Sequence, residues 1–493
     1  MRIINKGVFS KCCTLTTAVL SGGIVLPACS PAPPDGTGKP NFIIILTDDQ
    51  GYGDLGCYGS PDIRTPAIDR MAREGIRFTS FYAAPFSAPS RAQLMTGCYP
   101  ARVSHARNPG PSSPFGLHPS EVTIAELLRQ QGYATMCIGK WHLGDAPDFL
   151  PTSQGFDRYL GIPFSNDMWR YHPRMQPQES EDSLMKAIRQ RADYTGFAGQ
   201  GLYYPPGGGF PNDLPLMLND SVIELNPDQE QLTARYTSAA LAFIEKNKQR
   251  PFFLYLAHNK PHVPLFTAEE FKGKSFRGLY GDVMMEIDRS VGTIIDRLVA
   301  LGLDRQTMVV FVSDNGPWLQ YGIDGGSAGP LRDGKGSVYE GGMRVPAIFW
   351  WPGKIPADRV TSAVAGNLDL LPTLAGLAGA QLPPGRIIDG CDIWPVLTGM
   401  NPESPHEYFH YMAGSPEGQV NYRGIRDNRW KLLVTIDNDG NMHGSELYDL
   451  GSDAGERFNR LDRHPDVVQR LIREAQTFYN NLIMNIRPAG KRN

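Results

Sequence analysis

Long apolar runs alternate along this chain with segments whose apolar residues recur at helical spacing. The first run, Phe42 to Leu46, has no polar interruption and stops at Asp48 and Asp49. Such a run is typical of a strand that is buried on both faces of a parallel sheet. Similar strands are predicted at residues 133–139, 251–258 and 307–316.

Helices with recognisable ends are predicted between these strands. In segment 64–75, Thr65 is the predicted N-cap and Pro66 occupies the first helical position. Segment 120–132 repeats this design with Ser120 as its predicted N-cap. Two longer helices are predicted near 229–247 and around 282–301.

This alternation predicts an α/β fold with a large, mostly parallel sheet flanked by helices on both faces. Each predicted strand delivers polar residues at its carboxyl end, and ligands bind at that edge of an open α/β sheet. We therefore expect residues that are far apart in the sequence to converge there. They are Asp48, Asp49, Lys140, His142, His258, His262, Asp314 and Asn315.

The pattern changes near residue 401. Residues 421–437 and 446–450 read as short antiparallel strands, and 465–483 as a closing amphipathic helix. The sequence thus predicts a main domain at 40–400 and, at 401–493, a smaller C-terminal α+β subdomain with a short antiparallel sheet.

The first 39 residues are typical of an export signal and a tether. Basic residues precede an apolar run that is too short and too interrupted to span a membrane stably. The ending "LPAC" resembles a bacterial lipoprotein cleavage box, which predicts a signal peptide at 1–28, a lipid on Cys29 and a flexible tether at 29–39. The expected location is the periplasm or the outer membrane of a Gram-negative bacterium. A plain secretory peptide, with Cys29 incidental, is the alternative.

Composition narrows the range of partners. The 493 residues are 41% hydrophobic and 20% charged, as in a globular protein, and the formal net charge is −3. Without a basic surplus, nucleic acid is not an expected partner, and an anionic substrate has to be held by a few placed cations. The seven cysteines show neither metal-binding spacing nor a disulfide framework.

Hard oxygen donors follow two of the predicted strands. Asp48, Asp49, Asp314 and Asn315 offer three carboxylates and an amide oxygen, which suit Ca²⁺ or Mg²⁺. For the Asp48–Asp49 pair alone, a solvated turn is the alternative.

Cations and proton carriers complete the predicted site. Arg91, Lys140 and Lys335 can form a cationic cage around a tetrahedral oxyanion, as phosphoryl or sulfuryl transfer requires. His142 and His262 can move protons near neutral pH.

One serine has an unusual setting in the stretch "PFSAPSRAQLMTG", residues 85–97. Pro89 suits a first helical turn, residues 90–95 continue as helix, and Gly97 ends it. Ser87 would then lie at the positive end of that helix, where an anion is favoured. An ordinary N-cap serine is the alternative interpretation.

The same stretch resembles the signature of the type I sulfatases, C/S-x-P-S-R-x-x-L-x-T-G. Further blocks that look like this family follow in family order between residues 40 and 455, among them "GKWHLG", "PHVP", "SDNG", "GKGSVYEGGMRVP" and "ELYDL". The stretches "GFDRYLGIPFSND" and "YGDVMMEIDRSVGTIIDRLVALGL" look closest to the arylsulfatase A and N-acetylgalactosamine-6-sulfatase branch. The resemblance implies an alkaline-phosphatase-like fold.

It also implies a role for each candidate residue. Ser87 would be the precursor of formylglycine, the oxidised residue whose hydrate attacks the sulfate ester. Ca²⁺ would be bound by Asp48, Asp49, Asp314, Asn315 and the modified Ser87. The catalytic set would be Ser87, Arg91, Lys140, His142, His262 and Lys335, with Ser165, His262 and Lys335 contacting the substrate.

Most members of the family carry cysteine where this chain has Ser87. A serine implies either a formylglycine-generating maturase that accepts serine or an engineered replacement of cysteine. Only the modified residue could turn over, because a plain serine would be trapped as a stable sulfate ester.

The expected reaction is hydrolysis of a sulfated carbohydrate, such as sulfated galactose or N-acetylgalactosamine of host glycans. A phosphoester or phosphonate hydrolase on the same scaffold is one alternative, and a non-catalytic lipoprotein that binds sulfated glycans through an unmodified Ser87 is another. Possible sugar-binding residues are Asn166, Asp167, Trp169, His172, Tyr203 and Tyr204, with His105 and Arg107 as additions.

Overall fold

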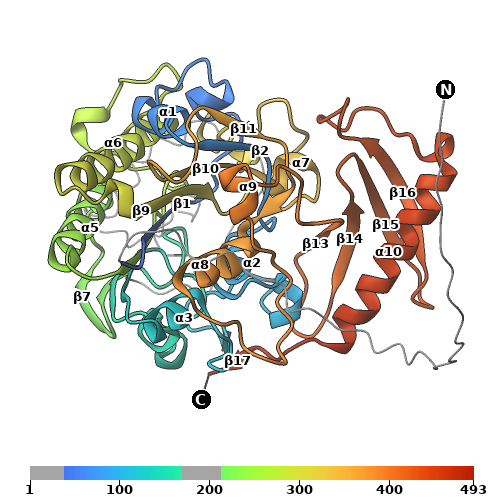
Figure 1. Ribbon diagram of the computed structural model, residues 1–493, viewed down its shortest axis with the longest axis horizontal. Helices are drawn as coiled ribbons and strands as arrows, with labels where there is room; N and C mark the ends of the chain where they lie inside the picture. The colour runs from blue at the N-terminus through green and yellow to red at the C-terminus, as the bar shows by residue number, and fades with distance from the viewer. Residues whose placement is uncertain (1–37, 169–212, 493) are drawn as a thin grey trace, which may run out of the picture. The chain divides into compact units, whose positions relative to one another are not determined.

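The structure is a computed structural model that describes residues 38–168 and 213–492. An eleven-stranded sheet runs through the larger part, in the order β11-β2-β10-β9-β1-β8-β4-β5-β6-β7, with β12 paired to β2 (Figure 1). The strands are β1 (Asn41–Thr47), β2 (Ile76–Tyr82), β4 (Ala134–Gly139), β5 (Arg158–Gly161), β6 (Pro215–Leu218), β7 (Ser221–Leu225), β8 (Phe252–Ala257), β9 (Thr307–Ser313), β10 (Arg344–Trp350), β11 (Arg359–Thr361) and β12 (Ala365–Gly366).

The centre of this sheet is parallel, as predicted. β1 lies between β8 and β9, so that Ile43 is opposite Leu254 on one side and Val309 on the other. β4 and β5 continue the parallel order beyond β8. The antiparallel pairs are formed by β10 with β2 and β9 and by β6 with β5 and β7. All four strands that the sequence predicts in the main domain therefore lie side by side.

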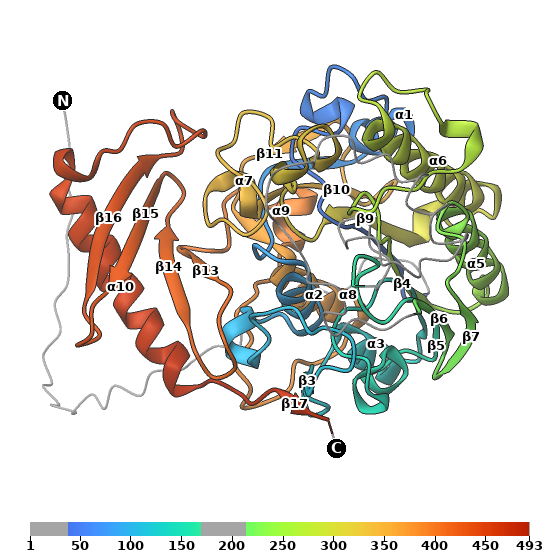
Figure 2. The same ribbon diagram turned by 180° about the vertical axis from the view of Figure 1, so that it is seen from behind.

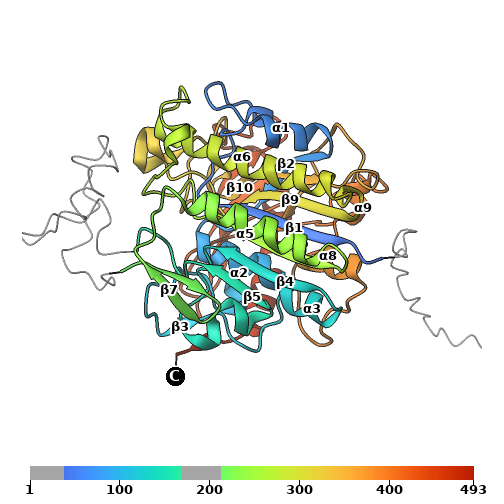
Figure 3. The ribbon, with the colours of Figure 1, turned by 90° about the vertical axis from the view of Figure 1, so that its left-hand side faces the viewer.

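Helices cover both faces of the sheet because alternate residues of β1 point to opposite sides. Ile43 and Ile45 join a core with α1 (Pro66–Arg73), α5 (Leu232–Asn247) and α6 (Leu279–Ala300). Ile44 and its neighbours on the other face join a core with α2 (Ser87–Thr96), α3 (Ile124–Gln130) and α8 (Leu370–Ala378). Figure 3 shows α5 and α6 lying side by side over one face. The predicted fold class is confirmed.

One predicted helix cap is wrong. The N-cap of α3 is Thr123, not Ser120, because Thr123 and Glu126 form a reciprocal capping box in which each side chain accepts a backbone N–H of the other residue. Helix α2 begins at Ser87, so Pro89 lies in its first turn and Gly97 ends it, as predicted, and Ser87 is itself the first helical residue. Thr65 and Pro66 have the predicted places in α1.

A separate four-stranded antiparallel sheet follows near the C-terminus, with α10 packed against it (Figures 1 and 2). Its elements are β13 (Phe409–Ala413), β14 (Asn421–Arg426), β15 (Trp430–Ile436), β16 (Met442–Asp449) and α10 (Pro465–Met484). The short helices α7 (Glu340–Met343) and α9 (Trp394–Thr398) precede it, and β3 (Phe115–Gly116) pairs with β17 (Gly490–Lys491) near the end of the chain. The architecture predicted for this part is confirmed, while the domain boundary at 400/401 stays a prediction.

The predicted signal peptide, Cys29 and nearly all of the predicted tether lie outside the described residues. Within residues 38–168 and 213–492, no helix combines the length and the apolar composition needed to cross a membrane.

Candidate active site

The loops that follow the central parallel strands meet at one edge of the sheet, and backbone hydrogen bonds hold them in place. The N–H of Asp314, after β9, donates to the carbonyl of Thr47 at the end of β1 (3.0 Å). The N–H of Lys140, after β4, donates to Ala257 at the end of β8 (2.8 Å). Residues from four strands are thereby fixed within reach of one another, which is the convergence expected from the sequence.

Ser87 lies inside this convergence, at the first position of α2, and is 1% exposed. Its hydroxyl oxygen is 2.9 Å from Asp48 Oδ1 and 3.3 Å from Asn315 Oδ1, so one hydrogen serves two acceptors. The Ser87 side chain is therefore aimed at the carboxylate cluster, and an N-cap role is excluded because Phe86 is the N-cap of this helix.

The carboxylate cluster depends on an unusual backbone conformation at Asp49, whose φ is +62°. A non-glycine residue in the left-handed region is uncommon and is often found at functional sites. It lets the Asp49 N–H donate to Asp314 Oδ1 (3.1 Å) and brings Asp49 Oδ1 within 2.7 Å of Asn315 Nδ2. Oxygen atoms from two distant loops are brought together in this way.

Three cations lie against these carboxylates. Arg91 holds Asp314 Oδ2 through both Nε (3.1 Å) and Nη2 (2.8 Å). Lys140 Nζ is 2.6 Å from Asp48 Oδ2 and also donates to Ser165 Oγ at 3.0 Å. The remaining contact is between Lys335 Nζ and Asp49 Oδ2, at 2.7 Å.

The nearby cations and burial shift the pKa values of Asp48 and Asp314 in opposite directions. Burial raises the pKa of Asp48, but the positive charges around it outweigh burial, and its pKa is well below the ordinary value. These charges come from Lys140, His262, Arg91 and Lys335. Burial and the negative charge of Asp48 raise the pKa of Asp314 to about 7, in spite of Arg91. The cluster thus brings together carboxylate and amide oxygens, hard donors that fit a divalent cation such as Ca²⁺.

His142 lies beside the cluster with no hydrogen-bond partner for either ring nitrogen among the described residues. Its side chain is buried, and burial together with the charges of Lys140 and Arg91 lowers its pKa well below the ordinary value. The imidazole is therefore neutral at neutral pH and has a lone pair that can accept a proton.

His262 follows β8 and also lies beside the carboxylates of this cluster. Its Nδ1 contacts the Val263 carbonyl, and its Nε2 is 3.4 Å from Asp49 Oδ2 and 4.0 Å from Asp167 Oδ2. Burial lowers the pKa of His262, although Asp49 opposes the shift. The edge of its ring packs against Trp318.

The other predicted residues that the structure describes make no contact with the carboxylate cluster. His258 is buried with no partner for Nε2 among the described residues, and burial lowers its pKa to about 3. His105 is buried beside the backbone of His142, and burial lowers its pKa to about 4. Arg107 stacks on Phe115. Asn166 bonds to Gln229, whereas Trp169, His172, Tyr203 and Tyr204 lie outside the described residues.

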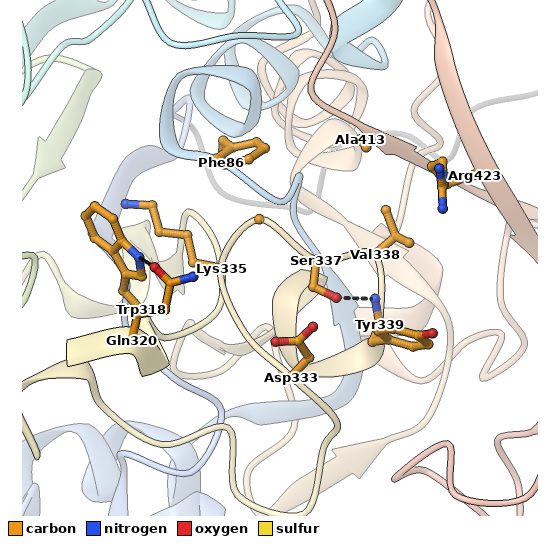
Figure 4. A pocket seen from close by; sticks show the side chains of 11 residues that line it. Phe86, Trp318, Gln320, Asp333, Lys335, Ser337, Val338, Tyr339, Ala413 and Arg423 are labelled. Atoms are coloured by element: carbon orange, nitrogen blue, oxygen red, sulfur yellow. Dashed lines mark hydrogen bonds between the residues drawn. The ribbon is translucent and has the colours of Figure 1, made fainter. Parts of the chain in front are cut away.

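A cavity of about 600 Å³ opens beside Lys335 (Figure 4). In that view Lys335 and Trp318 lie on one side of it and Arg423 on the other. Arg423 is exposed and makes no hydrogen bond or ion pair with another residue of the described chain. The cavity is lined by Phe86, Trp318, Gln320, Asp333, Lys335, Gly336, Ser337, Val338, Tyr339, Ala413 and Arg423.

Lys335 is the one residue of this lining that was predicted from the sequence. Phe86 and Trp318 stand next to predicted motifs, directly before Ser87 and shortly after "SDNG", which is a signal that could have drawn attention to them. Arg423 comes from β14 in the C-terminal sheet, and nothing in the sequence indicates that it lies near Lys335.

Comparison with known proteins agrees with this geometry. The family model described as "Sulfatase" matches residues 40–380, and the model "N-sulphoglucosamine sulphohydrolase, C-terminal" matches residues 333–479. The chain belongs to the sulfatase family and is a sulfuric ester hydrolase.

Individual members of the family show which branch this chain resembles. It is 40% identical to human arylsulfatase A over 461 residues, covering 88% of this chain and 86% of the relative. It is also 40% identical to the dog N-acetylgalactosamine-6-sulfatase over 478 residues, covering 90% and 86%. The crystal structure of Ps i-CgsB in complex with k-i-k-neocarrahexaose superposes with a TM-score of 0.74 at 32% identity, over 92% of this chain and 95% of that one. The branch predicted from the sequence is confirmed.

Proposed function

We propose that this chain hydrolyses sulfate esters of carbohydrates, using formylglycine derived from Ser87 and a bound Ca²⁺. The observation that carries the proposal is the setting of the Ser87 hydroxyl, which donates toward Asp48 and Asn315 inside a buried cluster with Arg91 and Lys140. A buried hydroxyl among fixed cations is suited to bind a sulfate group and to stabilise the charge that develops on its oxygens.

The metal would be held by the oxygen atoms of Asp48, Asp49, Asp314, Asn315 and residue 87. When bound, Ca²⁺ would act as a Lewis acid toward the sulfate oxygens. His262 is near Asp48 and Asp49 and could be counted with them as a ligand. We assign it to the substrate instead, because Ca²⁺ prefers oxygen ligands.

The chain's own residues then divide the remaining tasks. Arg91 and Lys140 orient residue 87, and Lys335 binds the sulfate together with Ser165. His142 accepts a proton from residue 87, which its unpartnered ring nitrogens and neutral state favour. His262 Nε2 would donate a proton to the oxygen of the departing sugar. Because Nδ1 faces the Val263 carbonyl, this proton comes from the imidazolium form, which the carboxylates of Asp49 and Asp167 favour.

A carbohydrate leaving group is supported by the cavity beside Lys335. Its volume of about 600 Å³ and its aromatic lining, with Phe86, Trp318 and Tyr339, suit sugar rings. Ps i-CgsB, which has a similar structure, was crystallised in complex with k-i-k-neocarrahexaose. Sulfated galactose and N-acetylgalactosamine are the proposed sugars.

The proposal extends to maturation and location. A maturase that accepts serine would oxidise Ser87, and export followed by a lipid on Cys29 would place the enzyme in the periplasm or on the outer membrane. The N-terminal pattern supports this location through the basic, apolar and "LPAC" segments in succession.

Two measurements test the function. Mass spectrometry of the Ser87 peptide from the native organism is expected to show the loss of two hydrogens, whereas an unmodified peptide would support a glycan-binding protein. Matured enzyme is expected to release sulfate from members of a panel of sulfated monosaccharides and oligosaccharides. Faster release of phosphate from matched phosphate esters would favour the phosphoester hydrolase and overturn the proposal.

A further inference from the structure

A second group of reactive side chains lies outside the sulfatase cluster, where the loop after α8 meets the start of the C-terminal sheet. Asp369 is the N-cap of α8, Cys391 lies in the loop between α8 and α9, and His406 precedes β13. Their ligand-type atoms lie within 4.8 Å of one another. None of the three takes part in the contacts made by Ser87 or by the residues around it.

The three side chains are connected in a fixed order. His406 Nε2 is 2.7 Å from Asp369 Oδ1, and His406 Nδ1 is 3.8 Å from Cys391 Sγ. Asp369 is fully buried and also accepts the N–H of Cys391 (2.7 Å) and, on its other oxygen, the N–H of Gly366 (2.7 Å). The carboxylate therefore cannot swing away, and it holds the imidazole with its second nitrogen toward the sulfur.

The charge on this imidazole is set by its neighbours. Burial lowers the pKa of His406, but the carboxylate of Asp369 and the sulfur of Cys391 raise it more, to about 10. The ring is therefore an imidazolium at neutral pH. Its Nδ1–H faces the sulfur of Cys391 and can stabilise the negative charge that develops on sulfur as it reacts.

The sulfur can also be reached by a reagent. Cys391 is partly exposed, in contrast to Cys98 and Cys137, which are fully buried. Burial also raises the pKa of the Cys98 thiol, to about 11, and holds that of Cys137 well above its ordinary value. These two cysteines provide internal references for a reactive thiol at position 391.

We propose that Cys391, His406 and Asp369 form a second reactive site, in which Cys391 is a nucleophilic thiol that undergoes exchange with low-molecular-weight disulfides. The order of nucleophile, imidazole and orienting carboxylate is the arrangement that activates cysteine nucleophiles elsewhere. In the exchange, Cys391 Sγ attacks one sulfur of the disulfide and forms a new S–S bond with it. The old S–S bond breaks, the other half leaves as a thiol after taking up the proton lost by Cys391, and Cys391 is oxidised to a mixed disulfide.

The expected rate follows from the position of the imidazolium beside the sulfur. A hydrogen bond to a charged group changes a rate or an equilibrium by about tenfold or more. A sulfur stabilised in this way is also a weaker nucleophile, so the lower end of that range, about tenfold, is expected. Replacing His406 should therefore slow the exchange about tenfold at pH 7.

The test treats the folded protein with oxidised glutathione at pH 7 and follows the Cys391 peptide by mass spectrometry. His406→Gln is expected to react about tenfold more slowly than wild type. The matched control is His410→Gln, which removes another buried histidine of the same region that bonds to Tyr422 rather than to Cys391, and it should leave the rate unchanged. A His406→Gln rate within twofold of wild type, or an equal loss in both variants, overturns the proposal.

A second comparison needs no variant and remains decisive if His406→Gln does not fold. In wild type, Cys391 of the native protein should form the mixed disulfide faster than Cys391 of the urea-unfolded chain, although unfolding exposes the sulfur more. Slower reaction in the native state contradicts the proposal. Neither test depends on the maturation of Ser87, so the outcome is independent of the sulfatase activity.

Discussion

A buried lysine of the C-terminal sheet contacts the segment 338–340, and replacing it by methionine tests how strongly this contact stabilises the protein. Lys431 on β15 is fully buried. Its Nζ is 2.9 Å from Glu340 Oε1, 2.8 Å from Glu456 Oε1 and 2.8 Å from the Val338 carbonyl. Lys335 lies only three residues before Val338, so the contact supports the segment that carries a catalytic cation.

The size of the effect follows from what Lys431→Met leaves behind. Two carboxylates, Glu340 and Glu456, would face each other in the interior without the cation between them. Burial alone raises the pKa of Glu340, but Lys431, then Arg344 and Arg426, lower it to about 2, so this carboxylate is charged at neutral pH. Breaking a buried ion pair in this way costs about 3–5 kcal/mol.

A surface pair of similar length provides the control. Lys248 Nζ is 2.6 Å from Glu245 Oε1, but both side chains are about 40% exposed. Lys248→Met removes the same charge and should cost about 0–1 kcal/mol, because water screens the pair. The two variants are expected to differ in the free energy of unfolding because the Lys431 pairs are buried and the Lys248 pair is exposed, although the distances are similar.

The assay is urea unfolding of both variants against wild type, with the free energy of unfolding taken from the midpoint and the slope. Lys431→Met should lower it by about 3–5 kcal/mol and Lys248→Met by less than about 1 kcal/mol. Equal losses in the two variants would refute the reasoning, since they would mean that the buried network adds nothing beyond a surface pair.

Three further predictions concern the site and its surroundings. Arg423→Ala should lower kcat/KM about tenfold for oligosaccharides with a second anionic group, because one hydrogen bond to a charge is lost. Aryl sulfates, which lack that group, should be hydrolysed as by wild type. Equal effects on both kinds of substrate would contradict the prediction. Because the pKa of His406 is raised to about 10, its pair with Asp369 should stabilise the fold fully below pH 6.5 and progressively less as the pH rises toward 10. The free energy of unfolding of wild type should therefore decrease over this pH range, and this decrease should be absent in His406→Gln. Cys391 and His410 are the other titratable groups nearby. Removal of divalent cations with a chelator should abolish sulfate release and Ca²⁺ should restore it, whereas full activity after chelation would rule out a metal role.

Much of the fold was predictable because the strands around β1 are read directly from uninterrupted apolar runs. Phe42 to Leu46 could be assigned with no knowledge of their neighbours, since burial on both faces leaves no room for polar residues. The convergence of residues after β1, β4, β8 and β9 then followed from the shared direction of parallel strands.

Other features depend on tertiary contacts that no local pattern carries. The N-cap of α3 is an exception, since the preference for Thr123 over Ser120 follows from a local pairing with Glu126, three residues after it. Arg423 is brought near Lys335 only by the way β14 packs in the C-terminal sheet. The possible sugar-binding residues predicted from the sequence lie mainly at 166–204, whereas the cavity beside Lys335 is lined largely by residues 318–339 and by Ala413 and Arg423 of the C-terminal sheet.

The central claim is that residue 87, held among fixed cations and a metal site, performs sulfate ester hydrolysis. The most direct measurement is sulfate release by wild type and by Ser87→Ala, each co-expressed with a serine-accepting maturase and assayed on the same sulfated oligosaccharide. The account predicts release by wild type, in proportion to the fraction of Ser87 peptide that has lost two hydrogens, and none by Ser87→Ala. Equal release by the two proteins would contradict it.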